Sequence, residues 1–479
     1  MLKIKNIIQK YRKLSIPAKA SIAYTFANLV SKSINIITVP IFTRMMSTYE
    51  VGISTTYSSW YSILYAVVTL SLCSGSLNIA MMDYEKERDR YLSACLTLST
   101  ISGFIFIIFY FIFSKPFNQI TALDSPVMCL LIISLVINPA LDYWYAKQRY
   151  EYNYIPLAVV SILVSILSSV VAIISVCSLK NDNVVSLGNV KVISQGIVIT
   201  IIALFFYINI MIKGKTYFDL TIWKYALKLS IPLIVHSLAK NILDVSDRLM
   251  ISNICGKSDA GIYGTIYSLA MLELLIWNAI NSSLIPITFE KVKQRKYKEL
   301  DSMLVRILFW FGIITILLVL FAPEVLKIFT TNEYVNAVHL IPALSAGVYF
   351  TALYNIYGNL LLYRKKTINI MLATTLAAIA NIILNYYFIN KFGYIAAAYT
   401  TLISFIILAL LQGIMVRVVY KEKVINDAIF LIISLVVAML CNLCNLLYDH
   451  IVVRYGIILI ILLVIAINRK KLLSIIKRK

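Results

Sequence analysis

Long apolar runs separated by short polar segments make up the chain from about residue 20 onward. An α-helix needs about 20 apolar residues to cross a hydrocarbon core of about 30 Å. Runs of this length recur fourteen times, and each is predicted to be a transmembrane helix. The predicted spans are 20–43, 53–80, 92–113, 126–146, 154–177, 190–212, 229–254, 260–286, 303–322, 335–363, 367–389, 393–416, 427–446 and 451–468.

The composition agrees with this pattern. Of the 479 residues, 60% are hydrophobic and only 14% are charged, and the mean hydropathy is +0.85. These values exclude a soluble globular protein and predict an all-α, polytopic membrane protein. Residues 1–19 alternate basic and apolar positions and lack the compact apolar core of a cleavable signal. They are predicted to form a cytoplasmic amphipathic segment.

The positive charge, a net +22, is explained by membrane topology. If the amino terminus is cytoplasmic, 33 of the 44 Lys and Arg residues fall in the cytoplasmic segments. This bias follows the positive-inside rule and predicts that both termini are cytoplasmic. Because the charge is spread over many short segments, no nucleic-acid partner is expected.

Two halves of the chain share a weak repeat. The motif G-I-x-x-T-x-x-S begins at Gly52 and again at Gly261, 209 residues later. Six spans per copy give parallel repeats, and transporters with such repeats place their substrate between the halves. We therefore expect two six-helix lobes around a central cavity, followed by two extra helices. The predicted domains are 1–19, 20–215 (N-lobe), 216–424 (C-lobe) and 425–479 with a basic tail.

Charged and polar side chains line one face of the first and seventh spans. In the first span these are Asn28, Lys32 and Asn35, and in the seventh His236, Lys240, Asp244, Asp247 and Arg248. A charge near the middle of a span costs roughly 2.5 to 3.5 kcal/mol, so such residues indicate function by default. The 209-residue offset aligns Lys32 with Asn241, one residue from Lys240, so the two lysines lie at nearly the same depth of their spans. We expect these two lysines to form a basic site.

A structural interpretation stays open for several of these residues. Lys240 and Asp244 are spaced for an intrahelical ion pair, and Arg248 can reach the membrane interface. Glu273 in the eighth span is either a proton or cation relay or the partner of a lysine. Asp142 is expected to be an interface residue. No metal-binding spacing occurs, and no cofactor is expected.

Several stretches resemble a known family. Residues 227–271, beginning "LKLSIPLIVHSLAKNILDVSDRLM", resemble the seventh and eighth spans of Wzx-like polysaccharide repeat-unit flippases of the multidrug/oligosaccharidyl-lipid/polysaccharide exporter superfamily. "NIILNYYFINKFGYIAAAYTTLISF", residues 381–405, resembles the eleventh and twelfth spans of the same branch. The most specific parts are the Asp247–Arg248 segment and the segment from Asn381 and Asn385 to Ala398. The resemblance covers most of residues 15–416.

The resemblance implies alternating access and export of undecaprenyl-diphosphate-linked oligosaccharide to the outer leaflet, for O-antigen, capsule or exopolysaccharide. Lysine suits phosphate as a point charge. The resemblance thus implies that Lys32, Lys240 and Arg248, with Asn28, Asn35 and His236, contact the diphosphate or sugar. Asp244, Asp247 and Glu273 are candidates for ion coupling. The expected partners are the lipid bilayer and the polysaccharide polymerase and chain-length machinery, in the bacterial inner membrane.

Three other functions were weighed. A flippase for the peptidoglycan lipid precursor would share the fourteen spans and a basic cavity. A multidrug or cation antiporter would favour an acidic or aromatic cavity. A membrane enzyme is disfavoured, because the chain has no Asp-x-Asp metal site, no long outward loop and no nucleophile triad.

Overall fold

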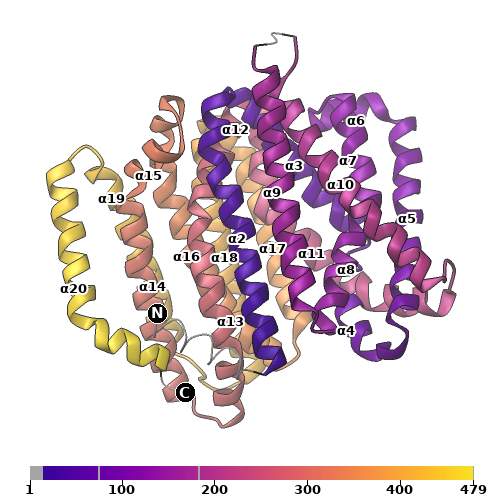
Figure 1. Cartoon of the computed structure of the whole chain (residues 1–479). Helices are drawn as coiled ribbons and strands as arrows, with labels where there is room; N and C mark the ends of the chain where they lie inside the picture. Colours follow the sequence, from indigo (N-terminus) through magenta and orange to yellow (C-terminus); the bar gives the residue numbers. More distant parts are fainter. Residues whose placement is uncertain (1–14, 74–75, 182–183, 478–479) are drawn as a thin grey trace, which may run out of the picture. The chain divides into compact units, whose positions relative to one another are not determined.

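The computed structural model describes residues 15–73, 76–181 and 184–477. In these ranges the chain forms helices and turns, without a strand (Figure 1). It divides into two compact units, Met1–Asn241 (unit 1) and Ile242–Lys479 (unit 2), and the boundary falls inside α11 (Leu220–Ile254). Residues 1–14 of the predicted amphipathic segment lie outside the described residues.

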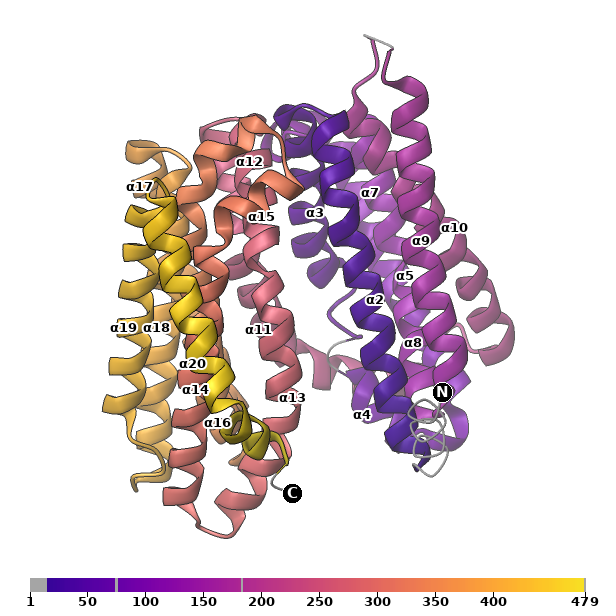
Figure 2. The ribbon, with the colours of Figure 1, turned by 60° about the vertical axis from the view of Figure 1, so that its left-hand side comes forward.

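Unit 1 is built around α10. Its helices are α2 (Ile16–Met45), α3 (Thr48–Val68), α4 (Ser76–Asp83), η1 (Glu85–Glu87), α5 (Arg88–Ile112), α6 (Ser114–Thr121), α7 (Ser125–Ile137), α8 (Pro139–Tyr150), α9 (Tyr154–Leu179), α10 (Leu187–Gly214) and the first part of α11. α10 packs against α3, α5, α7, α8 and α9, and α2 runs along α9 (Figure 2). Small residues on α10 permit this close packing. A Cβ at Gly196, for example, would lie 2.5 Å from Leu130.

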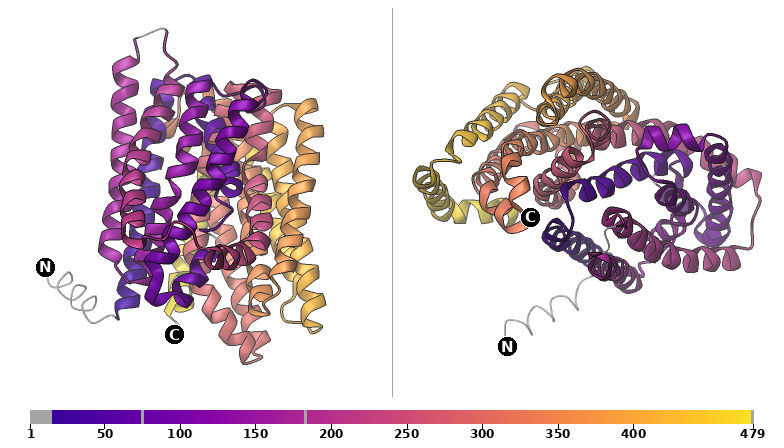
Figure 3. Two further views of the ribbon diagram at one scale, coloured as in Figure 1. Left: turned by 90° about the vertical axis from the view of Figure 1, so that its right-hand side faces the viewer. Right: turned by 90° about the horizontal axis from the view of Figure 1, so that it is seen from above.

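Unit 2 is built around α16. Its helices are the rest of α11, α12 (Lys257–Ala270), α13 (Leu272–Lys293), α14 (Tyr297–Leu320), α15 (Ala322–Phe329), η2 (Asn332–Leu340), α16 (Ile341–Tyr363), α17 (Thr367–Phe392), α18 (Ile395–Tyr420), α19 (Asp427–Cys444), η3 (Asn445–Leu447) and α20 (Ile451–Lys477). α16 packs against α13, α14, α18 and α19, and Figure 3 shows these helices from two further sides. α16 is predominantly apolar, and most of its residues are buried.

The number and placement of long apolar helices confirm a polytopic membrane protein. Among the described residues, eleven helices or helix pairs are long and apolar enough to span a membrane, or twelve if the bent α11 counts as one span. The predicted spans 53–80 and 451–468 are not among them; Ile451–Ile467 is apolar but shorter. Large apolar side chains such as Phe111 and Val452 stay exposed, as expected of surfaces that face lipid.

The predicted span 53–80 is wrong at its end. The helix there, α3, stops at Val68, and the chain turns through Leu70 and Ser71, whose φ angles are 54° and 45°. The Ser71 hydroxyl donates to the carbonyl of Ala66 at 3.0 Å and helps close the turn. Glycine and asparagine are the residues that most often adopt such left-handed backbone angles. Here leucine and serine adopt them, so the residue types do not predict the turn.

Helix bounds recur at the spacing of the sequence repeat. α3 begins at Thr48 and α12 at Lys257, 209 residues later. α5 begins at Arg88 and α14 at Tyr297, again 209 residues later. These bounds support a duplication, while the predicted domain limits stay a prediction.

Candidate functional site

Unit 1 contains a cavity of about 520 Å³, which we call the unit 1 cavity. Three pieces of chain form its wall: the end of α3 with the turn that follows, one face of α8 from its first turn to its end, and the middle of α11. The lining residues are Tyr65, Ala66, Thr69, Ser71, Cys73, Asp142, Ala146, Arg149, His236, Ser237, Lys240 and Asn241. A polar cavity of this size inside an apolar bundle is a candidate binding site.

Local sequence explains how these pieces meet. Pro139 cannot donate to the helix ladder, so α7 ends at Ile137 and α8 starts anew with Asp142 in its first turn. The side chain of Asn138, at the break, donates to the hydroxyl of Tyr61 on α3 at 3.1 Å. Asn241 on α11 donates to the carbonyl of Ser62 at 3.0 Å. These two bonds join α8 and α11 to α3 beside the cavity.

The start of α11 is held by Asp219. Its Oδ1 accepts from the backbone N–H of Thr221 at 2.9 Å and of Ile222 at 3.2 Å, and its Oδ2 accepts from Arg90 at 2.9 Å. The N–H of Ile222, together with Arg90, lowers the pKa of Asp219 below its usual range. The helix that carries His236 and Lys240 is therefore capped and tied to α5.

The charges in the cavity are mostly basic. Arg149 and Lys240 are cations, and the imidazole of His236 lies on the same helix as Lys240. Lys240 forms no hydrogen bond or ion pair within the described ranges. Asp142 is the one carboxylate among the lining residues, and the hydroxyl of Tyr65 donates to it. Such a set can hold a multiply charged anion through Arg149 and Lys240.

The predicted residues of the first span lie elsewhere in unit 1. Asn28, Lys32 and Asn35 are exposed side chains of α2 and do not line the cavity. α2 packs on α9 through another face, where Ser31 donates to the carbonyl of Ser161 at 3.3 Å. The structure thus brings His236 and Lys240 together with Asp142 and Arg149. The pairing of Lys32 with Lys240 stays a prediction.

In unit 2, Asp247 is buried in a closed hydrogen-bond network. Its Oδ2 accepts from Tyr263 at 2.5 Å and from Thr401 at 3.4 Å, and its Oδ1 accepts from the backbone N–H of Arg248 at 2.7 Å. The side chain of Asp247 is only 1% exposed. These three hydrogen-bond donors are all neutral groups of the protein itself.

A second set of amides and hydroxyls lies between α11, α17 and α18. Oδ1 of Asn381 accepts from Ser246 at 2.7 Å and from Asn385 at 3.0 Å, while its Nδ2 donates to Ser404 at 3.1 Å. Thr400 donates to Asn385. We call these residues, with Asp247, Tyr263 and Thr401, the Asp247 network. It joins the Asp247–Arg248 and Asn381–Asn385 segments that carry the sequence resemblance.

Arg248 has partners within the protein, whereas Glu273 is only partly hydrogen-bonded. The guanidinium of Arg248 lies 4.1 Å from the ring centre of Tyr267 and donates to the carbonyl of Asp244 at 3.4 Å. Glu273 is 1% exposed and accepts from Thr315 through Oε1, and its Oε2 has no hydrogen-bond partner in the part of the chain that the structure describes. Glu273 lines neither the unit 1 cavity nor the cavity of unit 2 where α18 joins α19.

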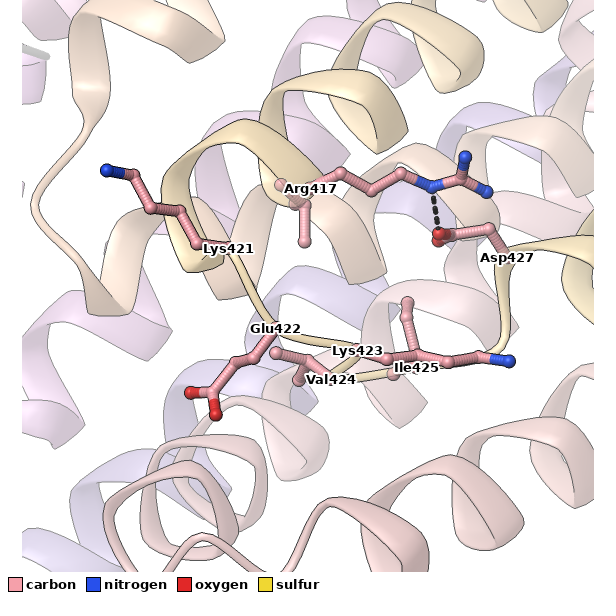
Figure 4. A pocket seen from close by; sticks show the side chains of 8 residues that line it. Arg417, Lys421, Glu422, Lys423, Val424, Ile425 and Asp427 are labelled. Carbon is pink, nitrogen blue, oxygen red and sulfur yellow. Dashed lines mark hydrogen bonds and ion pairs between the residues drawn. The ribbon is translucent and has the colours of Figure 1, made fainter.

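A second cavity, of about 340 Å³, lies in unit 2 where α18 joins α19 (Figure 4). Arg417 and Asp427 form an ion pair across it, with Nε and Oδ2 2.5 Å apart. The side chains of Lys421 and Lys423 point to opposite sides in Figure 4. They present no joint binding surface, so the unit 1 cavity is the stronger candidate.

Sequence reasoning missed Asp142, Arg149 and Tyr65 as cavity residues. Asp142 had been placed at an interface, because it lies near the cytoplasmic end of its predicted span. Only the structure pairs these positions, across two helices of matching spacing. Tyr61 and Tyr65 lie one turn apart, and so do their partners Asn138 and Asp142, each 77 residues further along.

Comparisons with known proteins agree with this fold. Residues 18–292 match the sequence model of the family described as polysaccharide biosynthesis protein, and residues 232–387 match that of the MatE family. Protein 1 of the Lsg locus of Haemophilus influenzae is 22% identical over 281 residues, which are 58% of this chain and 67% of that protein.

Three solved structures share the fold. The lipid II flippase MurJ, in an inward closed conformation, has a TM-score of 0.68 at 19% identity, and the match covers 95% of this chain and all of that one. A multidrug resistance MATE family transporter in an inward-facing conformation has a TM-score of 0.58 at 14% identity, covering 83% of this chain and 96% of that one. A MOP superfamily transporter from Pyrococcus furiosus has a TM-score of 0.54 at 15% identity, covering 85% and 97%.

Proposed function

We propose that this chain, which belongs to the polysaccharide biosynthesis protein family, moves undecaprenyl-diphosphate-linked oligosaccharide repeat units from the cytoplasmic to the outer leaflet. The family and the fold are those of multi-pass membrane transporters and flippases. The proposal adds the substrate, the direction of transport and alternating access. It also places the chain in the bacterial inner membrane, with both termini cytoplasmic.

The unit 1 cavity is the observation that carries this proposal. A lipid-linked diphosphate has an anionic headgroup that hydrocarbon excludes, so its carrier must offer a polar, positive space within the membrane. Arg149 and Lys240 supply positive charge there, and Ser237, Asn241 and Thr69 supply hydroxyl and amide groups suited to sugar. With the cell interior negative, each negative charge exported gains about 2.3 kcal/mol per 100 mV.

The remaining predicted residues have narrower roles in the proposal. Lys32, Asn28 and Asn35 on α2 stay candidates for sugar or diphosphate contact at another stage of the cycle, as does Arg248. Asp244, Asp247 and Glu273 stay candidates for proton or sodium coupling. Glu273 stays a candidate because its buried Oε2 has no hydrogen-bond partner among the described residues and is available to an ion. Transport that is insensitive to both ion gradients in vesicles would remove all three from the coupling role.

A flippase for the peptidoglycan lipid precursor is the second candidate. The likeness to MurJ supports it as a fold, and its cargo would present the same diphosphate to Arg149 and Lys240. The two cargoes differ in their sugars and peptide, which the charges of the cavity do not distinguish.

The test is a strain that lacks this protein. We expect lipid-linked repeat units to accumulate on the cytoplasmic leaflet, and wild-type protein to clear them. The double variant Arg149→Ala/Lys240→Ala should be expressed without clearing them. Lys228→Ala is a matched control, because Lys228 is an exposed lysine of α11 outside the cavity. Accumulation of the peptidoglycan precursor instead would favour the second candidate, and no accumulation of either would contradict both.

A further inference from the structure

Asp142 is unexpected in the unit 1 cavity, because a carboxylate repels the anion that the cavity is proposed to bind. The groups around it are Tyr65 and Cys73 from α3 and its turn, Arg149 from α8, and His236 and Lys240 from α11. Among the described residues, no cation lies within ion-pair distance of Asp142, and Tyr65 is its hydrogen-bond donor. Its carboxyl group therefore lines the space that an anion would enter without a cation of the protein paired to it.

The position of Asp142 is fixed by the helices around it. The rings of Tyr57, Tyr61 and Tyr65 follow one another along α3, with centroids 6.1 and 5.5 Å apart. Tyr61 is held by Asn138, whose Oδ1 accepts from Thr200 at 3.3 Å. One turn further along, Tyr65 holds Asp142. The hydrogen bond from Tyr65 therefore favours a position of the carboxyl group at the cavity wall.

We propose that Asp142 is an internal counter-ion, which competes with the anionic headgroup for Arg149 and Lys240 and so enables its release. This inference rests on the proposed function and adds a residue that sets the strength of binding. Two cations alone would hold a diphosphate tightly, and tight binding that is equal in every state does not speed turnover. At an effective dielectric of about 20, a fixed negative charge about 6 to 12 Å from the headgroup weakens binding by about a hundredfold to tenfold.

Asp142 also stabilises the cavity when no anion is bound. After release, Arg149 and Lys240 would otherwise be left as two like charges lining the same cavity, which is unfavourable. Asp142 compensates part of that charge while the carrier returns without cargo. The residue therefore favours both steps that follow transport, the release of the anion and the return of the empty protein.

The experiment measures binding of farnesyl diphosphate, a soluble short prenyl diphosphate, to the purified full-length protein by calorimetry. Asp142→Asn should bind about tenfold to a hundredfold more tightly than wild type. Asp142→Glu, which keeps the charge, should bind like wild type. Asp124→Asn is a matched control, because Asp124 is an exposed carboxylate of unit 1 outside the cavity; its affinity should not change.

Export in cells supplies the second readout. Asp142→Asn should clear lipid-linked repeat units more slowly than wild type at saturating substrate, although it binds more tightly. A merely structural role for Asp142 would lower both binding and export. Asp142→Ser provides a second neutral replacement if Asp142→Asn does not fold, and melting curves identify which of the two is folded.

The outcomes separate the two proposals. Unchanged or weaker binding by a folded neutral variant, with binding still lost in Arg149→Ala/Lys240→Ala, would overturn the counter-ion role and leave the proposed function standing. Binding that does not depend on Arg149 and Lys240, or no binding by any form of the protein, would contradict the anion site itself and the counter-ion role with it.

Discussion

In unit 1, the charged side chains of Asp142, Arg149 and Lys240 line a cavity of about 520 Å³. In unit 2, the polar side chains of the Asp247 network form hydrogen bonds with one another. Lys240 has no hydrogen-bond or ion-pair partner among the described residues, while Asp247 accepts three hydrogen bonds. Both residues lie on α11, only seven positions apart in the sequence. The comparison shows that charge in a membrane helix marks different roles, according to whether its partners are already present.

A satisfied network contributes to stability, because removing one member leaves its buried partners without hydrogen bonds. An unsatisfied cationic cavity contributes little to stability and has charge available for a ligand. Substitutions in unit 2 should therefore change the stability of the protein, and substitutions in the unit 1 cavity should change transport. Three substitutions test this division, and a fourth, outside both sites, tests the capping of α11.

The largest effect is expected for Asp247→Ala. The change leaves the hydroxyls of Tyr263 and Thr401 buried without this acceptor, which should lower the free energy of unfolding by about 3 kcal/mol. Thermal melting in detergent measures it. Asp247→Asn keeps the shape and should cost only about 1 kcal/mol. A fully stable Asp247→Ala variant that fails in transport would instead assign Asp247 to ion coupling.

Asn381→Ala should have the next largest effect. Asn381 is completely buried and makes three hydrogen bonds in the Asp247 network. Its loss should lower the free energy of unfolding by about 2 kcal/mol, measured in the same way. Asn390→Ala is the control, because Asn390 is an exposed asparagine of the same helix. Equal melting temperatures for the two variants would contradict the stabilising role of the network.

Lys240→Ala should show the opposite behaviour. Removing one phosphate contact should slow export by about tenfold, which corresponds to about 1.4 kcal/mol. The melting temperature should stay close to that of wild type, within about 0.5 kcal/mol in stability, because Lys240 has no partner to lose. Export assays and melting curves on one preparation check both. A strongly destabilised Lys240→Ala variant would place Lys240 among the structural residues.

The smallest effect is expected at Asp219, outside the membrane-spanning segments. Its pKa is lowered by the N–H of Ile222 and by Arg90, so its contribution to stability is present above the usual pKa of aspartate, about 3.9, and is lost as the pH falls through its lower folded value. Asp219→Ala should cost about 0.5 to 1 kcal/mol at neutral pH. Melting at neutral pH and near pH 3 measures it; a cost that persists unchanged in acid would contradict the cap.

The fold could be predicted from the sequence because length and hydropathy define membrane spans. The end of α3 could not, since the left-handed turn at Leu70 and Ser71 carries no glycine or asparagine signal. His236 and Lys240 were accessible to sequence reasoning, because polar residues in an apolar run are conspicuous. Asp142 and Arg149 were not, because only the packing of α8 against α3 and α11 brings them into the cavity.

Reconstituted transport tests the central claim most directly, that Arg149 and Lys240 carry a diphosphate-linked sugar across the membrane. Purified protein in liposomes would be supplied with lipid-linked oligosaccharide in the inner leaflet, and its appearance outside would be followed with an impermeant sugar-binding lectin. We predict transfer with wild type and with Lys228→Ala, and little transfer with Arg149→Ala/Lys240→Ala. Equal transfer by wild type and the double variant, or none by the folded wild-type protein, would contradict the account.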